Sequence, residues 1–175
     1  GEVHAVCGAN GAGKSTLMNV LSGTIRASGG TISIDGEAMT FASPADARKA
    51  GVAIVYQEFS SIPELSVADN IYLGREFRGR FGRVDRAQAS QAAAALLERY
   101  GIDLDPDAPV ETLGVADRQL VEFARALAID ARILILDEPT AVLSVAEQTK
   151  LFSVIRGLRT RGILILYISH RLEEI

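Results

Sequence analysis

Residues 8–16 combine glycine, lysine and hydroxyl side chains in a spacing that suits phosphate binding. The segment reads Gly-Ala-Asn-Gly-Ala-Gly-Lys-Ser-Thr and fits the pattern G-x-x-x-x-G-K-[ST] from Gly8 to Ser15. Its glycines let backbone N–H groups point toward an anion, and the compact ammonium of Lys14 fits between β- and γ-phosphate oxygens. The Ser15 hydroxyl is expected to ligate Mg²⁺, and Thr16 is placed to bond a phosphate oxygen. The predicted nucleotide-binding residues are therefore Gly8, Ala9, Asn10, Gly11, Ala12, Gly13, Lys14, Ser15 and Thr16.

Three further polar sites each follow a short apolar run that is typical of a buried strand. Asp137 and Glu138 follow Ile133-Leu134-Ile135-Leu136, Gln57 follows residues 53–56, and His170 follows residues 163–169. Ligands bind at strand ends in open α/β sheets, so Asp137 is expected to hold Mg²⁺ directly or through water. Glu138, on the opposite side, is placed to orient and deprotonate an attacking water. The neutral amide of Gln57 is suited to contact the metal or the attacking water. His170 is suited to contact the γ-phosphate. By itself each residue is also typical of an exposed strand end.

The elements that must position these residues alternate along the chain. Strands are predicted over residues 2–7, 51–56, 133–136 and 163–169, with a hairpin over 30–40. A helix is predicted from about Gly13 to residue 21, and further helices begin near Ser66, Asp85, residue 115 and Ser144. The pattern predicts an α/β fold, a P-loop nucleoside-triphosphatase core with a mainly parallel sheet and a small antiparallel hairpin region. We assign residues 1–59 and 114–175 to this core, and residues 60–113 to an inserted helical subdomain.

Composition narrows the class of protein. The chain has 175 residues and a net charge of −4, which argues against nucleic acid as a main partner. No stretch approaches the roughly 20 apolar residues that a membrane span needs. Cys7 is the only cysteine, so an internal disulfide is excluded; its strand position predicts a small core residue. The first residue is not methionine, so we expect a fragment of a longer protein.

Taken in order, these motifs resemble the nucleotide-binding domain of ATP-binding cassette (ABC) ATPases. The resemblance covers essentially the whole chain and is closest to bacterial sugar-importer ATPases of the ribose, galactose and xylose type. It rests on the phosphate loop and on the stretches Tyr56-Gln57-Glu58, residues 63–71 (PELSVADNI), 121–127 (VEFARAL), Leu136-Asp137-Glu138-Pro139-Thr140 and residues 167–175 (YISHRLEEI). Those importer ATPases carry two such domains, and an intact phosphate-loop lysine is similar to the amino-terminal one.

The resemblance implies an ATPase that uses ATP and Mg²⁺ to energise import of a sugar or related small solute. It implies that Glu138, His170 and Gln57 are catalytic, and that Ser15, Gln57 and Asp137 serve the metal. The implied partners are a second nucleotide-binding domain, transmembrane permease subunits and, indirectly, a solute-binding protein. The implied location is the cytoplasmic face of the bacterial inner membrane, peripheral through the permease. Because the second domain completes each site, the isolated chain is predicted to bind ATP weakly and to hydrolyse little.

One segment departs from the family pattern. The signature Leu-Ser-Gly-Gly-Gln (or Leu-Ser-Val-Gly-Gln) is replaced by Leu113 followed by Gly114, Val115, Ala116 and Asp117. The serine hydroxyl that should meet the partner domain's γ-phosphate is missing, and Asp117 adds a negative charge. At about 4 Å the repulsion is roughly 1 kcal/mol in water and about 4 at an effective dielectric of 20. We therefore hypothesise that the Lys14 site hydrolyses ATP, whereas the composite site using residues 114–117 is weak or only binds.

Other functions stay open at this point. A soluble ABC ATPase acting on nucleic acid or ribosomes is expected to carry coiled-coil insertions or basic arms, which this sequence lacks. A small-molecule P-loop kinase leaves Gln57 and His170 unexplained. A nucleotide sensor without turnover is opposed by the intact Glu138.

Overall fold

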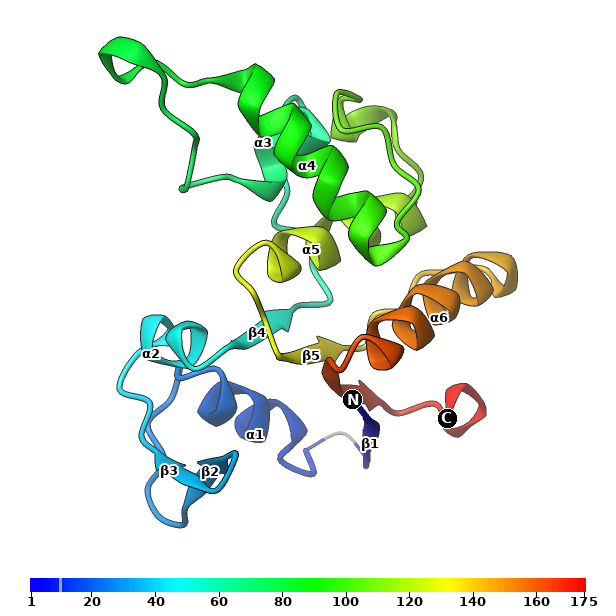
Figure 1. The fold of residues 1–175 in the computed structure, drawn as a ribbon. Coiled ribbons are helices and arrows are strands. Elements are labelled where there is room, and N and C mark those ends of the chain that lie inside the picture. Colours follow the sequence, from blue (N-terminus) through cyan, green and yellow to red (C-terminus); the bar gives the residue numbers. More distant parts are fainter. Residues whose placement is uncertain (10) are drawn as a thin grey trace.

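A parallel four-stranded sheet forms the centre of the molecule (Figure 1). The structure, a computed structural model, describes residues 1–9 and 11–175, and all side chains there except those of Phe81 and Leu172. The sheet order is β1 (Val3–Cys7), β6 (Leu164–Ser169), β5 (Ile133–Asp137) and β4 (Val52–Val55). A separate antiparallel pair consists of β2 (Ile32–Ile34) and β3 (Glu37–Met39). The predicted fold class, an α/β protein with a parallel sheet and a small hairpin, is confirmed.

Helices connect these strands and start close to the predicted positions. The α-helices described are α1 (Lys14–Leu21), α2 (Pro44–Lys49), α3 (Val67–Ile71), α4 (Arg86–Tyr100), α5 (Val115–Leu127) and α6 (Val145–Thr160). Single 3₁₀ turns are η1 (Arg80–Gly82), η2 (Val110–Thr112) and η3 (Leu172–Glu174). The expected N-caps are confirmed, because Ser66, Asp85 and Ser144 each accept the backbone N–H three residues further on.

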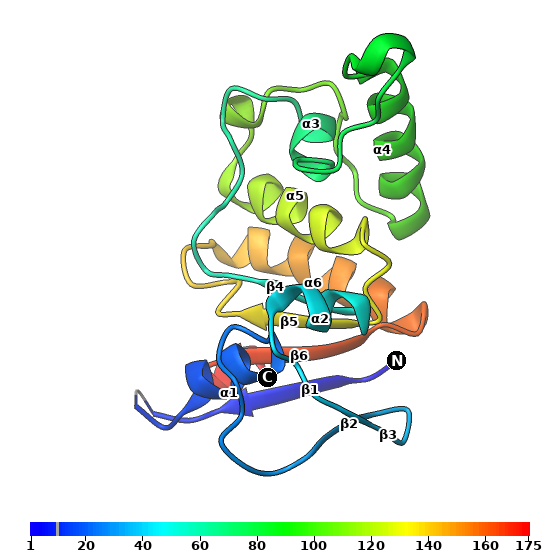
Figure 2. The ribbon, with the colours of Figure 1, turned by 90° about the vertical axis from the view of Figure 1, so that its left-hand side faces the viewer.

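The alternation of side chains along β5 explains why the sheet is covered on both faces. Leu134 and Leu136 belong to a core shared with α3, α4, α5 and α6, whereas Ile135 lies in a second core with residues of α1 and α2. Successive side chains of a strand point to opposite faces, so a continuous apolar run is expected only where both faces are buried. Figure 2 shows α5 and α6 on one side of the sheet and α1 on the other.

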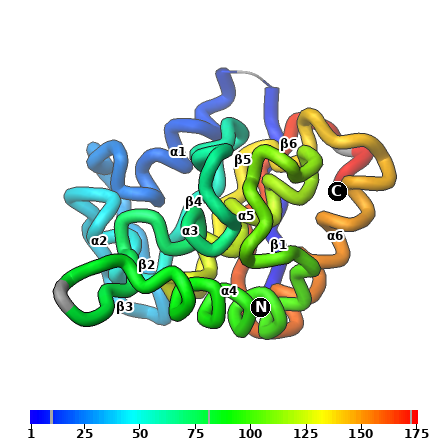
Figure 3. Tube along the Cα trace, turned by 90° about the horizontal axis from the view of Figure 1, so that it is seen from above, coloured from blue at the N-terminus to red at the C-terminus, as the bar shows by residue number. Residues whose placement is uncertain are grey.

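The segment between β4 and α5 forms a layer beyond the helices that cover the sheet. Helices α3 and α4 pack against each other, and α3 also packs on α5, away from the strands (Figures 2 and 3). Val67 and Ile71 of α3 are fully buried in the same core as Leu120 and Phe123 of α5. The predicted insert over residues 60–113 spans this layer, and its division from the core stays a prediction.

Two features differ from what the sequence pattern indicates. Helix α2 was missed, although Ser43 caps it, Pro44 starts it and Asp46 lies in its first turn. The prediction for Cys7 was wrong: its side chain is exposed, as are most residues of β1, an edge strand that pairs with β6. Within the described chain, helices fall short of the length and apolar character required to cross a bilayer.

Candidate active site

The register of the parallel strands brings the predicted polar sites to one edge of the sheet. Cys7 pairs with Ser169, and Ile168 pairs with Asp137, so the phosphate loop, His170 and the two carboxylates leave the sheet at the same level. Val55 pairs with Leu136, which brings the start of the Gln57 loop next to the end of β5. Parallel strands lie about 4.8 Å apart, so the ends of β1 and β5 are separated by about 10 Å.

The phosphate loop has the backbone that its glycines were expected to provide. Gly11 and Gly13 have φ angles of 84° and 92°, in the left-handed region that side chains other than glycine rarely adopt. Gly13 caps α1, so the loop runs directly into the positive end of a helix, which favours anions. Asn10 lies outside the described residues. The exposed Ser15 and Thr16 occupy the first turn of α1.

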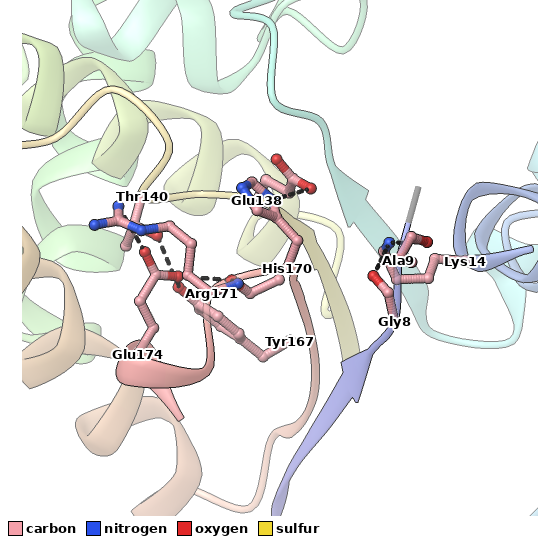
Figure 4. Close-up of polar contacts among 10 residues, drawn as sticks. Gly8, Ala9, Lys14, Glu138, Thr140, Tyr167, His170, Arg171 and Glu174 are labelled. Atoms are coloured by element: carbon pink, nitrogen blue, oxygen red, sulfur yellow. Dashed lines mark hydrogen bonds and ion pairs between the residues drawn. The ribbon is translucent and has the colours of Figure 1, made fainter. Parts of the chain in front are cut away.

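Lys14 directs its ammonium back into the loop. Its Nζ donates to the carbonyl oxygen of Gly8 at 2.6 Å and to that of Ala9 at 3.2 Å (Figure 4). These bonds hold the charge beside the loop rather than in bulk solvent. The ammonium therefore lies against the backbone of the loop, beside the positive end of α1.

Asp137 is the last residue of β5 and lies half-buried at the edge of the sheet. Burial raises the pKa of its carboxyl, the negative charge of Glu138 raises it further, and the charge of Lys14 lowers it. The carboxylates of Asp137 and Glu138 therefore repel each other, while Lys14 acts on Asp137 from across the strand edge. A cation near Asp137 relieves this repulsion, and carboxylate and hydroxyl oxygens are ligands that Mg²⁺ prefers.

Glu138 and His170 are in direct contact. His170 Nδ1 lies 2.9 Å from Glu138 Oε1, with the histidine half-exposed and the glutamate more deeply placed (Figure 4). The backbone N–H of Glu138 donates to the carbonyl oxygen of Ile168 at 3.0 Å, which ties the two loops together. Glu138 has a φ of 45°, a left-handed conformation that costs about 1 kcal/mol or more for a residue with a β-carbon. The sequence places both residues at strand ends but does not reveal their contact or this strain.

Gln57 and the degenerate signature lie apart from this centre. Gln57 is exposed beyond β4, three strands from the phosphate loop but adjacent to the end of β5. Gly114 caps α5 without a side-chain hydrogen bond, Ala116 is buried, and Val115 is exposed. Among the described residues, hydrogen bonds and ion pairs do not join this segment to the phosphate loop. The placement agrees with the hypothesis that the segment serves another domain's site, and that role stays a proposal.

An unexpected partner neutralises Asp117. Lys150 Nζ donates to Asp117 Oδ1 at 2.6 Å, linking the first turn of α5 to α6. The two residues are 33 positions apart, so local sequence patterns do not reveal the pair. The negative charge of Asp117 is therefore largely compensated, and the repulsion expected from the sequence applies in full only if Lys150 moves away.

Metal binding by protein groups alone is not supported. Across residues 1–9 and 11–175, no three His, Cys, Asp or Glu side chains gather closely enough to hold a metal ion. The predicted ligands are instead a hydroxyl, an amide and one carboxylate. Such a set holds Mg²⁺ in company with phosphate oxygens and water, as nucleotide sites commonly do.

The amino-acid sequence is similar to those of known proteins over its whole length. The sequence model of the ABC transporter family matches residues 1–141. Over all 175 residues the chain is 53% identical to "Ribose import ATP-binding protein RbsA 2" of Streptomyces avermitilis and 54% identical to the protein of that name from Burkholderia cenocepacia. In both comparisons the chain spans 35% of the relative's length.

Solved structures agree with the sequence comparison. The ADP conformation of MJ1267, an ATP-binding cassette of an ABC transporter, superposes with a TM-score of 0.84 at 26% identity, covering 99% of this chain and 72% of that one. CbiO1 from Clostridium perfringens, part of the ABC transporter complex cbiONQ, gives a TM-score of 0.81 at 26% identity, covering 99% and 69%. The chain therefore belongs to the ABC transporter family.

Proposed function

We propose that this chain is the ATP-binding and ATP-hydrolysing part of an importer for ribose or a related small solute. The observation that carries the proposal is the convergence of Lys14, Asp137 and the Glu138–His170 pair at one sheet edge. Whole-chain similarity to ribose import ATP-binding proteins supports the choice of solute. It also favours import over the alternative of a soluble ATPase that acts on nucleic acid or ribosomes.

We assign each of these residues a separate role in ATP hydrolysis. The amides around Gly11 and Gly13 and the Lys14 ammonium bind the β- and γ-phosphates and stabilise the charge that develops on them. Glu138 orients a water and accepts its proton as the oxygen bonds to the γ-phosphorus; the bond to the β,γ-bridging oxygen breaks, and ADP leaves. His170 holds the Glu138 carboxylate in position.

Mg²⁺ fits the same site. The Ser15 hydroxyl and the Asp137 carboxylate are hard oxygen ligands. Gln57 lies beyond the end of β4, apart from the phosphate loop, so it would act on the ion only through water. Burial and the neighbouring charge of Glu138 both disfavour the ionised form of Asp137, and a cation bound there would favour it. When bound, the ion would neutralise negative charge on the β- and γ-phosphates.

The whole importer requires parts beyond this chain. We propose a second nucleotide-binding domain, in the same polypeptide, which faces the degenerate segment Gly114–Asp117 and completes two composite sites. Permease subunits would receive the motion of the paired domains, with a solute-binding protein acting on the far side of the membrane. The chain would then lie at the cytoplasmic face of the inner membrane, held there by the permease.

The proposal is tested in the full-length protein assembled with its permease. Replacing Glu138 by Gln keeps the shape of the side chain but removes its basicity, so kcat should fall by about 10² to 10⁴-fold. ATP binding and the stability of the complex should persist, and ATP-driven uptake of radiolabelled ribose should stop. Glu37→Gln, an exposed hairpin residue, is the matched control and should behave as wild type. Undiminished turnover in Glu138→Gln would contradict the proposed role of this carboxylate.

Lys14 offers a separate test of the binding step. Lys14→Met preserves the length of the side chain and removes the ammonium that the loop holds at 2.6 Å from Gly8. ATP affinity at this site should fall by more than tenfold, because charge-assisted contacts to phosphate are lost. An unchanged affinity, measured by equilibrium titration, would show that the triphosphate binds elsewhere.

A further inference from the structure

A cluster of polar side chains, buried except for that of Arg171, connects the loop after β5 with the segment after β6. Its members are Thr140, Tyr167, Ser169, Arg171 and Glu174 (Figure 4). Thr140 and Tyr167 are almost completely buried, and the Glu174 side chain is 4% exposed although Glu174 lies in a short 3₁₀ turn near the surface. A carboxylate is rarely buried to this extent unless it is paired and hydrogen-bonded, so its position is a specific feature.

The hydrogen bonds of this cluster have a defined direction. The Tyr167 hydroxyl has one proton and donates it to Glu174 Oε2 at 3.0 Å, because a carboxylate only accepts. Thr140 Oγ1, 3.0 Å away, must then donate to the Tyr167 oxygen. Burial is the main factor that raises the pKa of Tyr167, so its hydroxyl stays protonated and available as a donor at neutral pH.

Glu174 also binds the strand end that carries His170. Ser169 Oγ donates to the same Oε2 at 2.9 Å and accepts the backbone N–H of Arg171 at 2.9 Å. Arg171 Nη1 lies 3.0 Å from the other oxygen, Oε1. His170 is therefore flanked on both sides by residues that Glu174 binds.

The cluster connects the two loops that supply the Glu138–His170 pair. Thr140 is two residues beyond Glu138, and Ser169 and Arg171 are the neighbours of His170. Among the described residues, one side-chain hydrogen bond joins the loops directly, between Glu138 and His170. A second route runs from Thr140 through Tyr167 to Glu174 and Ser169, and a backbone bond joins Glu138 to Ile168. A half-exposed hydrogen bond between a histidine and a carboxylate contributes little by itself, so the contact at 2.9 Å depends on how its loops are held.

We propose that Glu174 is a positioning residue that holds His170 against Glu138 through Tyr167 and Ser169. Loss of the carboxylate frees two hydroxyls and Arg171 and releases the His170 loop. Glu138 then orients the attacking water less well, whereas the Lys14 ammonium is held by the carbonyl oxygens of Gly8 and Ala9, outside this cluster. The inference rests on the proposed ATPase function and concerns the catalytic step rather than ATP binding.

The test uses the full-length protein with its permease and compares two adjacent glutamates. Glu174→Gln should lower kcat about tenfold with the KM for ATP changed less than twofold, because displacement of a catalytic group by a fraction of an ångström affects the chemical step. Glu173→Gln, the same change at an exposed neighbour, should leave both constants at wild-type values.

Repeating the measurement in a His170→Ala variant distinguishes a positioning role of Glu174 from a general loss of stability. In His170→Ala, Glu174→Gln should lower kcat by less than about twofold further, since the residue through which it acts is gone. Tyr167→Phe, which retains the ring and removes one donor, should show the same dependence on His170 and serves if Glu174→Gln folds poorly. A full tenfold loss in both backgrounds, or an unchanged kcat for both variants in otherwise wild-type protein, would overturn the inference. A wild-type complex without ATPase activity would instead overturn the proposed function.

Discussion

If the segment Gly114–Asp117 faces a second nucleotide-binding domain, as we propose, its ion pair with Lys150 sets how much negative charge it presents there. Replacing Lys150 by Met should weaken ATP binding at the composite site that Gly114–Asp117 completes. Replacing Asp117 by Asn should strengthen binding at that site. The two changes have opposite signs because each leaves one charge of the ion pair uncompensated, and under our proposal that charge would face the triphosphate bound by a second nucleotide-binding domain.

The structure determines the size of these effects. Lys150 Nζ and Asp117 Oδ1 are 2.6 Å apart, and their side chains are 45% and 30% exposed. An exposed pair of this kind contributes less than about 1 kcal/mol to folding, so neither variant should unfold. A lone charge about 4 Å from a phosphate oxygen contributes roughly 1 kcal/mol in water. Because solvent reaches this pair, we use that lower value, which corresponds to about a fivefold change in affinity.

The assay is equilibrium titration of the full-length protein with a fluorescent ATP analogue, in a Lys14→Met background that silences the first site. We expect about fivefold weaker binding for Lys150→Met, about fivefold tighter binding for Asp117→Asn, and a double variant within twofold of the background. Lys150→Arg preserves the charge and is the control. Shifts of the two single variants in the same direction, or the absence of any shift above twofold, would refute the reasoning.

Three further predictions concern the fold and its strained loop. Leu134→Ala should lower the free energy of unfolding by about 2–5 kcal/mol in urea titrations, because Leu134 is fully buried. The free energy of unfolding should fall as pH rises above 10.0, the ordinary tyrosine pKa, because Tyr167 ionises only in the unfolded state there; Tyr167→Phe should flatten this dependence. Glu138→Ala and Glu138→Gly both lose the carboxylate, but glycine accepts the φ of 45°. The free energy of unfolding from denaturant titration should therefore be about 1 kcal/mol higher for Glu138→Gly than for Glu138→Ala. Equal free energies of unfolding would show that the loop is unstrained.

Local sequence patterns predicted most helices and strands, because these elements depend on residues close together in the chain. The strand, glycine loop and helix around Gly13 follow from backbone freedom and helix-end chemistry, which are properties of neighbouring residues. Capping by Ser66, Asp85 and Ser144 is likewise a contact over three positions. The edge that gathers the polar residues was also predictable in outline, since the carboxyl ends of parallel strands share one side of a sheet.

Contacts between distant segments could not be predicted in the same way. The order β1-β6-β5-β4 places His170 between the phosphate loop and Glu138, and no local pattern contains this order. Sequence reasoning treated Glu138 and His170 as separate strand ends, and the structure joins them. It treated Asp117 as an uncompensated charge, because Lys150 lies on a different helix.

The backbone conformation of Glu138 lowers the local stability of the loop after β5. Its left-handed conformation is unfavourable for a glutamate and would suit glycine, yet a carboxylate occupies the position. The conformation is held from four directions: its N–H bonds Ile168, its carbonyl oxygen accepts from Ala141, its side chain meets His170, and Thr140 anchors the loop to Tyr167. A strained backbone conformation that is stabilised by so many contacts at a charged residue indicates that the position serves function rather than stability. The same contacts that enforce the strain hold the carboxylate against His170, so the position of the proposed base and the conformation of the loop have one cause.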